Sequence, residues 1–322
     1  MAKKNKKFRV IRRPPEVDWI PESQQRYAAI DIGSNGVRLL LSKVITSGEF
    51  TVYTKESLVR MPIRLGADVF ARRSISENLE EKLVFTMMGF ANLIKAYGPR
   101  AVRACATSAM REAENGAAIT ERIQQESGLE LEIIDGGAEA EIILASHVAE
   151  SLNPEHAYLY IDVGGGSTEL TLFAKQERLA SRSFAIGTVR MLNKQVTKSA
   201  WLEMKAWVKE HSPVGMPLRA IGSGGNMNKL FRMSGNMPDQ AVKYKSLVAI
   251  DDLLNSYNIE ERIRILHLRP DRADVILPAS KIFRSIMKWG QIKLIYVPQF
   301  GLADGLVHVM HHDFIGEQKL KK

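Results

Sequence analysis

The sequence has little of what cross-links a protein or anchors it in a membrane. Cys105 is the only cysteine among 322 residues, which excludes an intramolecular disulfide and cysteine-based zinc sites. Apolar runs are short, as at residues 39–41, whereas a membrane-spanning helix needs about 20 apolar residues. The basic N-terminus is not followed by the apolar segment of a secretory signal peptide. We therefore expect a cytoplasmic protein with no membrane partner.

The central part of the sequence also lacks the basic excess that is typical of nucleic-acid-binding domains. The formal net charge is +9, but ten basic residues lie at the two ends, in residues 1–13 and 319–322, where no acidic residue occurs. The other 35 basic residues nearly balance the 36 acidic ones. We expect no specific nucleic-acid partner and interpret residues 1–26 as a basic, disordered tail. Electrostatic binding of a polyanion by this tail remains an alternative.

From residue 27 onward, stretches typical of strands alternate with stretches typical of helices, which favours an α/β architecture. The chain is long enough for two domains. The pattern predicts strands at residues 27–43, 50–59, 101–106, 129–134, 158–163, 169–173, 218–221 and 292–297. It predicts helices at residues 74–97, 108–127, 139–152, 199–210 and 302–312, with others between the last strands. Ser74 and Glu77 fit a capping box, and Pro278 is expected to kink or divide a helix.

One internal repeat stands out. Residues 27–41 read YAAIDIGSNGVRLLL, and residues 158–172 read YLYIDVGGGSTELTL. In each, an apolar strand ends in an aspartate, a glycine-rich turn follows, and a second strand leaves. The repeat aligns Asp31 with Asp162, Gly33 with Gly164, and Arg38 with Glu169. Two similar halves suggest two similar domains that face each other across a cleft.

Glycine-rich turns let the backbone approach an anion and point successive N–H groups at it. An aspartate at the end of the preceding strand can hold Mg²⁺, which accepts both carboxylate and phosphate oxygens. A tight hairpin turn is the simpler interpretation of any single turn. Two matched Asp-Gly turns favour phosphate binding, and so does a third glycine turn at residues 222–226. The candidate phosphate-binding residues in these turns are Asp31, Gly33, Ser34, Asn35, Arg38, Gly164, Gly165, Gly166, Ser167, Gly224 and Gly225.

Other known motifs are absent. The sequence has no G-x-x-x-x-G-K-[ST] loop and no intact G-x-G-x-x-G after a strand. His308, His311 and His312 match no zinc signature.

Two further residues are candidates on position. Arg111 follows a predicted strand at the start of a predicted helix, where its guanidinium suits a phosphate; an exposed helical arginine is the alternative. Glu139 opens the helix after Gly136 and Gly137. It either caps that helix or polarises a water in the cleft, and spacing alone leaves both interpretations open.

Eight segments together resemble the exopolyphosphatase/guanosine pentaphosphate phosphatase (Ppx/GppA) family in its short, two-domain form. They are AIDIGSNGVRL at 29–39, ATSAMREAEN at 106–115, IIDGGAEAE at 133–141, YIDVGGGSTEL at 160–170, AIGTVRM at 185–191, IGSGGNM at 221–227, RADVILPA at 272–279 and GLADGL at 301–306. The resemblance implies two ribonuclease-H-like, actin-like ATPase domains facing across a cleft. We place the first at residues 27–135 and the second at 136–302, with residues 303–322 packing back on the first.

The resemblance also implies roles. Glu139 aligns with the catalytic glutamate that activates water, Arg111 with an arginine that holds the phosphate chain, and Asp162 and Glu169 with the metal-binding residues. Four positions depart from the family pattern: Gly36 replaces a serine, Ala138 an acidic residue, Asn226 a threonine, and Ala303 a common arginine.

The expected function is Mg²⁺-dependent hydrolysis of terminal phosphoanhydride bonds, with inorganic polyphosphate or guanosine pentaphosphate as substrate. A kinase of the same superfamily that uses ATP is one alternative, and a catalytically silent nucleotide-sensing module is another. A homodimer is implied only by analogy with the family.

Overall fold

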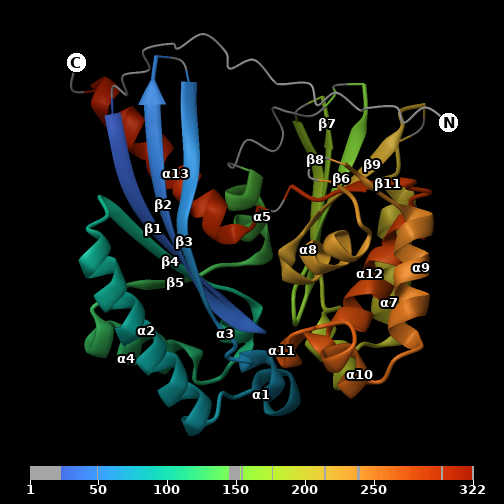
Figure 1. Ribbon diagram of the computed structural model, residues 1–322, viewed down its shortest axis with the longest axis horizontal. Coiled ribbons are helices and arrows are strands. Elements are labelled where there is room, and N and C mark those ends of the chain that lie inside the picture. Colours follow the sequence, from blue (N-terminus) through green and yellow to red (C-terminus); the bar gives the residue numbers. More distant parts are fainter. Residues whose placement is uncertain are drawn as a thin grey trace, which may run out of the picture.

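The computed structural model describes residues 23–48, 50–144, 153, 155–175, 177–213, 215–237, 240–298 and 300–320. Most of the predicted tail, residues 1–22, lies outside these ranges, and so do residues 145–152 of one predicted helix. The described residues form two mixed sheets with helices around them (Figure 1). None of the helices in these ranges combines the length and apolar character that crossing a membrane requires.

The first sheet has the strand order β3-β2-β1-β4-β5. β1, β2 and β3 form an antiparallel meander. β4 then pairs in parallel with β1, and β5 pairs in parallel with β4. The elements in chain order are β1 (Ser23–Gly33), β2 (Gly36–Ser47), β3 (Phe50–Met61), α1 (Leu65–Arg72), α2 (Glu77–Tyr97), β4 (Ala101–Ala106), α3 (Ser108–Glu112), α4 (Gly116–Ser127), β5 (Leu131–Ile133) and α5 (Gly136–Leu144).

The second sheet has the strand order β10-β11-β9-β6-β7-β8. The elements are β6 (Ala157–Val163), β7 (Thr168–Ala174), β8 (Glu177–Phe184), α6 (Thr188–Leu192), α7 (Lys198–Glu210), β9 (Leu218–Ser223), α8 (Gly224–Met233), β10 (Val242–Lys243), α9 (Tyr244–Asn255), α10 (Ile259–Arg264), α11 (Pro270–Ala273), α12 (Ile276–Trp289), β11 (Leu294–Tyr296) and α13 (Leu302–Leu320).

The two sheets repeat one topology. The order β8-β7-β6-β9-β11 in the second matches β3-β2-β1-β4-β5 in the first. The hairpins also share their register: Asp31 pairs with Arg38 in the first, and Asp162 pairs with Glu169 in the second. The repeat predicted from the sequence is therefore confirmed in three dimensions, with both aspartates at the end of a central strand.

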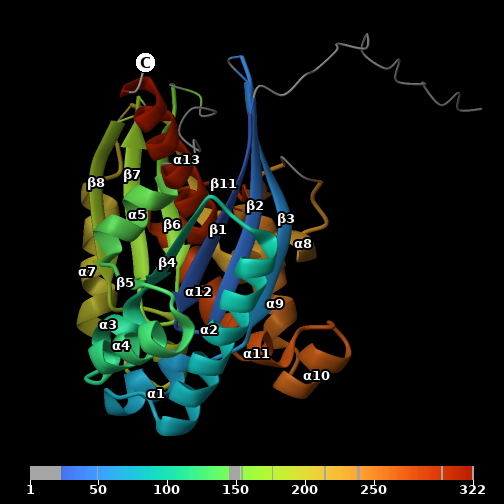
Figure 2. The same ribbon diagram turned by 90° about the vertical axis from the view of Figure 1, so that its left-hand side faces the viewer.

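Each sheet is covered by a helix that follows the other sheet in the chain. α5 comes after the first sheet but contacts β7 and β8, whereas α13 comes after the second sheet and contacts β1, β2 and β4. The two helices pack on each other between the sheets (Figures 1 and 2). They approach closely at Gly305, where a Cβ atom would lie 2.1 Å from the carbonyl oxygen of Ile142. Only glycine permits this crossing.

Three local predictions are corrected, and several elements were not predicted. α2 is preceded by Ser76 and not by a capping box at Ser74, and the Ser76 hydroxyl donates to Asp68 instead of capping the helix. The predicted helix at 108–127 is two helices, because the Asn115 side chain pairs with the backbone of Ile75 and holds the chain in a break. Pro278 lies in the first turn of α12, where its missing N–H costs no hydrogen bond, so the helix is not divided. α1, β8, α6 and β10 were not predicted.

Candidate active site

A cavity of about 100 Å³ lies where the glycine turns of the two halves meet. Most of the residues predicted from the sequence line it: Asp31, Gly33, Ser34, Asn35, Arg38, Glu139, Asp162, Gly164, Gly165, Ser167, Glu169, Gly224 and Gly225. The other lining residues are Gly36, Arg60, Thr107, Ser108, Val163, Thr188, Asn226, Arg272, Gly301 and Leu302. Residues that are up to 271 positions apart in the sequence therefore form one polar cavity.

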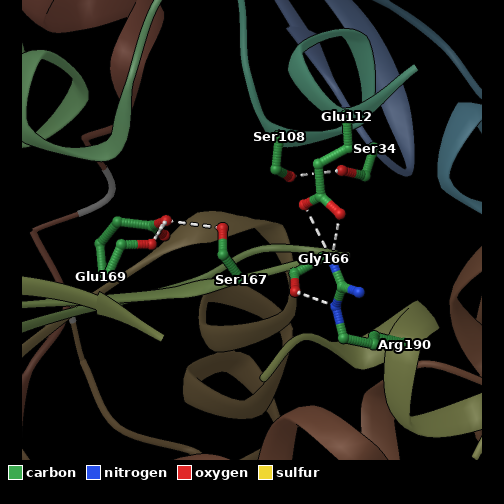
Figure 3. A network of polar contacts seen from close by, with 8 residues as sticks. Ser34, Ser108, Glu112, Gly166, Ser167, Glu169 and Arg190 are labelled. Carbon is green, nitrogen blue, oxygen red and sulfur yellow. Dashed lines mark hydrogen bonds and ion pairs between the residues drawn. The ribbon is translucent and has the colours of Figure 1, made fainter. Parts of the chain in front are cut away.

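The first hairpin turn holds its acidic residue in an ion pair. Asp31 is buried and accepts a hydrogen bond from Arg38, its register partner on β2. The hydroxyl oxygen of Ser34 in the same turn lies 2.9 Å from that of Ser108 at the start of α3 (Figure 3). Asp31 raises the pKa of Arg38, which stays a cation. This side of the cavity therefore presents a guanidinium and two hydroxyls.

The second hairpin turn holds its acidic residues differently. Glu169 accepts a hydrogen bond from the Ser167 hydroxyl at 2.6 Å (Figure 3). The same carboxylate oxygen accepts one from the Ser183 hydroxyl at 3.0 Å, so both donors orient it. No ion pair involves Asp162 or Glu169 among the described residues. Unlike Asp31, these two carboxylates have no basic side chain as a partner in the part of the chain that the structure describes.

The backbone of the second glycine turn packs closely against side chains of the first half. A Cβ atom on Gly165 would lie 2.7 Å from that of Ser34, and one on Gly166 would lie 2.1 Å from the ring of Phe70. Gly166 was predicted to bind phosphate, but it does not line the cavity; it packs on the first half instead. Glycine is needed here for contact between the halves.

Arg190 fixes the same loop, and sequence reasoning did not single it out. Its Nε donates to the carbonyl of Gly166 at 2.9 Å, and its Nη2 lies 2.7 and 2.8 Å from the two carboxylate oxygens of Glu112 (Figure 3). Its guanidinium also stacks over the Phe70 ring. Because Glu112 belongs to α3 and Arg190 to α6, this group ties the glycine loop of the second half to the first.

The third glycine turn brings the start of α8 to the cavity. Gly224 has a φ of +88°, a left-handed conformation that favours glycine. A Cβ atom there would lie 3.2 Å from Oδ1 of Asp162. The turn thus places the N–H groups of a helix start beside the carboxylate that ends β6.

The position of Glu139 distinguishes between a helix-capping role and a role in activating water. Oδ1 of Asp135 accepts hydrogen bonds from the backbone N–H groups of Gly137 and Ala138, both at 2.8 Å, and so caps α5. Glu139 lies in the first turn of that helix and lines the cavity. The cap is therefore Asp135, and the Glu139 carboxylate is free to act on a group in the cavity.

The acidic side of the cavity concentrates negative charge. Burial and the charges of Glu169, Asp162 and Asp31 raise the pKa of Glu139 well above its ordinary value. Burial and Asp162 raise the pKa of Glu169 to about 7. Burial also raises the pKa of Asp162. Like charges that cannot all ionise together are stabilised by a cation placed among them.

The donors on this side fit Mg²⁺. Among the described residues, no three His, Cys, Asp or Glu side chains form a ready-made metal cage. Mg²⁺ does not need one, because it is usually bound by one or two carboxylates together with substrate phosphates and water. Asp162 and Glu169 supply two carboxylates, and the serine hydroxyls on Glu169 are the hydrogen-bonding support typical of metal ligands.

Arginines that lie close to one another also line the cavity, and two of them, Arg60 and Arg272, were not predicted. Arg60 pairs with Asp271 at 2.6 Å, and its Nε and Nη1 are buried without a hydrogen-bond partner in the described structure. Arg272 makes no ion pair among the described residues, and burial together with Arg60 lowers its pKa to about 10. A buried guanidinium without a counterion, such as that of Arg272, is costly unless an anion binds it, and Arg60 has buried N–H groups that Asp271 does not use. This side therefore suits phosphate.

Gly36, one of the four departures from the family pattern, is connected to Arg60. A Cβ atom at position 36 would lie 3.0 Å from Nη2 of Arg60 and 3.1 Å from the carbonyl oxygen of Met61. A serine would press on the guanidinium. Of the other departures, Asn226 lines the cavity, and Ala138 and Ala303 pack in the apolar cluster under α13.

Arg111 is not among the lining residues. Its Nη1 donates to the carbonyl of Ile134 at 2.6 Å, and the side chain is exposed. Its charge nevertheless lowers the pKa values of Glu139 and Glu169, so it lies near the acidic side. Its role in holding the phosphate chain stays a prediction.

Comparison with known proteins agrees with this arrangement. The family model described as the Ppx/GppA phosphatase family matches residues 51–314. Exopolyphosphatase 2 of Mycobacterium tuberculosis is 26% identical over 313 residues, with 87% of this chain and 97% of the relative covered.

Solved structures share the fold. The Ppx/GppA family member of Aquifex aeolicus has a TM-score of 0.70 at 25% identity, with 90% of this chain and 99% of that one covered. An exopolyphosphatase from Cytophaga hutchinsonii has a TM-score of 0.76 at 23% identity, with 89% and 97% covered. The predicted α/β fold with two actin-like halves is confirmed. Because the family match spans most of the sequence, the chain belongs to the Ppx/GppA phosphatase family.

Proposed function

We propose that this protein is a Mg²⁺-dependent exopolyphosphatase, which releases orthophosphate from the end of inorganic polyphosphate. One observation carries the proposal: a small cavity has carboxylates without a basic partner on one side and, on another, a cluster of arginines that includes the unpaired Arg272, and glycine turns line it as well. A phosphate chain with a bound cation matches both sides. Exopolyphosphatases 1 and 2 of M. tuberculosis, to which this chain is similar, support the choice of substrate.

In the proposed mechanism, the chain's own residues position and neutralise the phosphate. The N–H groups of the three glycine turns and the guanidinium groups of Arg38, Arg60 and Arg272 hold the terminal phosphates. Asp162 and Glu169 would hold Mg²⁺, which supplies charge neutralisation at the phosphate oxygens. Glu139 accepts a proton from the attacking water.

Glu139 must be ionised to act as a base. Its raised pKa is caused mainly by burial and by the charges of Glu169 and Asp162. Asp162 and Glu169 would hold a cation that offsets their charge, which would lower the pKa of Glu139, so we expect the metal site and the base to depend on each other.

The two alternatives are tested directly. A silent sensing module has no need of Glu139 in the cavity, and the position of this residue argues against it. A superfamily kinase would transfer phosphate from ATP to a hydroxyl group. Phosphate release from polyphosphate and from guanosine pentaphosphate is measured side by side, together with label transfer from ATP to a panel of sugars.

We expect release from polyphosphate, and activity on guanosine pentaphosphate as a second proposed substrate. Label on an organic acceptor without phosphate release would favour the kinase. The sequence supports a cytoplasmic location, and the resemblance supports a homodimer, which light scattering during size-exclusion chromatography tests.

A further inference from the structure

A second hollow, away from the active-site cavity, opens on the second half of the molecule. Its volume is about 590 Å³, and it lies at β9, β10, β11 and the end of α12. We call it the basic hollow. It is lined by Arg219, Lys243, Tyr244, Lys245, Met287, Lys288, Gln291, Ile292, Lys293 and Leu294.

The charges of the basic hollow all have one sign. Five of its ten lining residues are basic, and none is acidic. None of the five forms an ion pair within the described residues, and Nε of Arg219 is buried there without a hydrogen-bond partner. The central part of the chain is nearly neutral overall, so this local excess is not a consequence of composition. Clustered cations without counterions repel one another, and a polyanion relieves that repulsion.

The basic hollow and the active-site cavity lie at opposite ends of the same strand. Arg219 lies near the start of β9, whereas Gly224 and Gly225 of the cavity follow its end. Five residues of strand correspond to about 16 Å. No residue lines both sites. A ligand that engages both must be extended and must carry charge along its length.

We propose that the basic hollow binds the distal part of the inorganic polyphosphate chain whose end lies in the active-site cavity. The proposal rests on the proposed function. The cavity, at about 100 Å³, holds only the chain's end, so the rest of a long substrate lies on the surface. Engagement at two linked sites raises affinity for long chains far above that for short ones.

The chemistry of the hollow favours polyphosphate over nucleic acid. Sites for single-stranded nucleic acid combine basic grooves with several aromatic side chains on which successive bases stack. Tyr244 is the only aromatic residue that lines the basic hollow. Five ammonium and guanidinium groups without a stacking platform suit an anion that has phosphates and no bases.

The test compares two variants: one loses three positive charges in the basic hollow, and the other loses three positive charges elsewhere on the surface. The hollow variant carries Lys243→Gln, Lys245→Gln and Lys293→Gln, all at exposed lysines. The matched control carries Lys95→Gln, Lys198→Gln and Lys209→Gln, which are also exposed lysines without ion pairs in the described structure and lie outside both sites. Both have the same net charge. Circular dichroism and thermal melting verify that they fold.

Binding is measured by fluorescence anisotropy with labelled long-chain polyphosphate and with tripolyphosphate, in full-length protein that also carries Glu139→Gln to prevent turnover. We expect the hollow variant to raise Kd for the long chain about 10-fold over the control, with Kd for tripolyphosphate unchanged. The slope of log Kd against log salt should fall by about 2.

Equal long-chain affinity in the hollow variant and the control overturns the proposal. A larger loss of affinity for single-stranded RNA of matched charge than for polyphosphate overturns it as well, because the hollow would then be a nucleic-acid surface. The protein without the Glu139→Gln substitution is assayed for phosphate release in parallel. If it releases no phosphate from any polyphosphate, the proposed function is wrong, whatever the binding results.

Discussion

The two glycine-turn hairpins have the same topology and register, but they differ in one charge. In the first, Asp31 faces Arg38 across the hairpin, and the two form an ion pair. In the second, Asp162 faces Glu169, and neither has a cationic partner among the described residues. The same scaffold thus gives a neutralised aspartate in one half and a pair of unneutralised carboxylates in the other.

This difference divides the work of the proposed site. Arg38, together with Arg60 and Arg272, makes one side of the cavity suited to phosphate oxygens. Asp162, Glu169 and Glu139 make the other side suited to a cation and to proton transfer. The comparison teaches that a duplicated binding loop can serve two functions when the residue opposite its aspartate is basic in one copy (Arg38) and acidic in the other (Glu169).

Replacing the proposed base should have the largest effect. Glu139→Gln keeps the shape of the side chain but cannot accept a proton, and loss of a general base costs about 100- to 10,000-fold in rate. Steady-state phosphate release measures it. Because Asp135 caps α5, the thermal midpoint should hardly move. Asp135→Asn is the control, with little loss of rate. If the Glu139→Gln enzyme retains more than about a third of the rate, Glu139 is not the general base and its role is structural.

Neutralising the two equivalent aspartates should separate the halves. Asp162→Asn should raise the Mg²⁺ concentration for half-maximal rate at least about 10-fold, since it removes a proposed ligand. Asp31→Asn should leave that concentration nearly unchanged, because Asp31 is already paired with Arg38. Metal titrations of phosphate release compare them. If Asp31→Asn has the larger effect, the metal side is in the first half and our division is reversed.

The arginine side is tested through Arg60. Arg60→Gln should raise KM for polyphosphate about 10-fold, the loss expected for a hydrogen bond to a charged group. Gly36→Ser should act in the same direction, because its side chain would press on the Arg60 guanidinium.

Arg64→Gln is the matched control for this prediction. Arg64 also bridges the halves, through an ion pair with Asp274 at 2.7 Å, but it does not line the cavity. An equal rise in KM in the control would assign the effect to contact between the halves and not to phosphate binding.

The smallest expected effect concerns the helix that covers the first sheet. His311 of α13 hydrogen-bonds with the Tyr27 hydroxyl at 3.1 Å and contacts Tyr53, and burial, with a smaller effect of His312, lowers its pKa. As pH falls below 6.5, the unfolded chain binds the proton more readily than the folded one, so the free energy of unfolding decreases. Urea unfolding at pH 7.5 and 5.5 should show a smaller pH dependence in His311→Gln. Identical dependence in both proteins would exclude His311 as its source.

The sequence was sufficient for the hairpins because their signal is local and repeated. Asp31 and Asp162 each end an apolar strand, and the glycines follow directly, so one pattern predicts both the turn and its chemistry. The correspondence of Arg38 with Glu169 was also predicted, and the register confirms it.

The arginine side could not be predicted in the same way. Arg60 lies on β3 and Arg272 in the short helix α11, and only the packing of the halves brings them together. Arg190 and Glu112 likewise form their ion pair between elements 78 residues apart. The missed strand β8 is mostly exposed, so it lacks the alternating apolar pattern that predicts a half-buried strand.

The exchange of α5 and α13 has a consequence for how the chain is made. The ribosome releases the first sheet long before α13, which supplies Leu302, Leu306, Val307 and Met310 to the apolar cluster with Tyr27 and Leu40. Until those last residues emerge, one face of the first sheet lacks its cover, and exposed apolar surface of this kind is what chaperones and proteases recognise. The first sheet can therefore complete its fold only after α13 has been synthesised. A chain truncated before residue 302 should be degraded and should not accumulate as a folded first half.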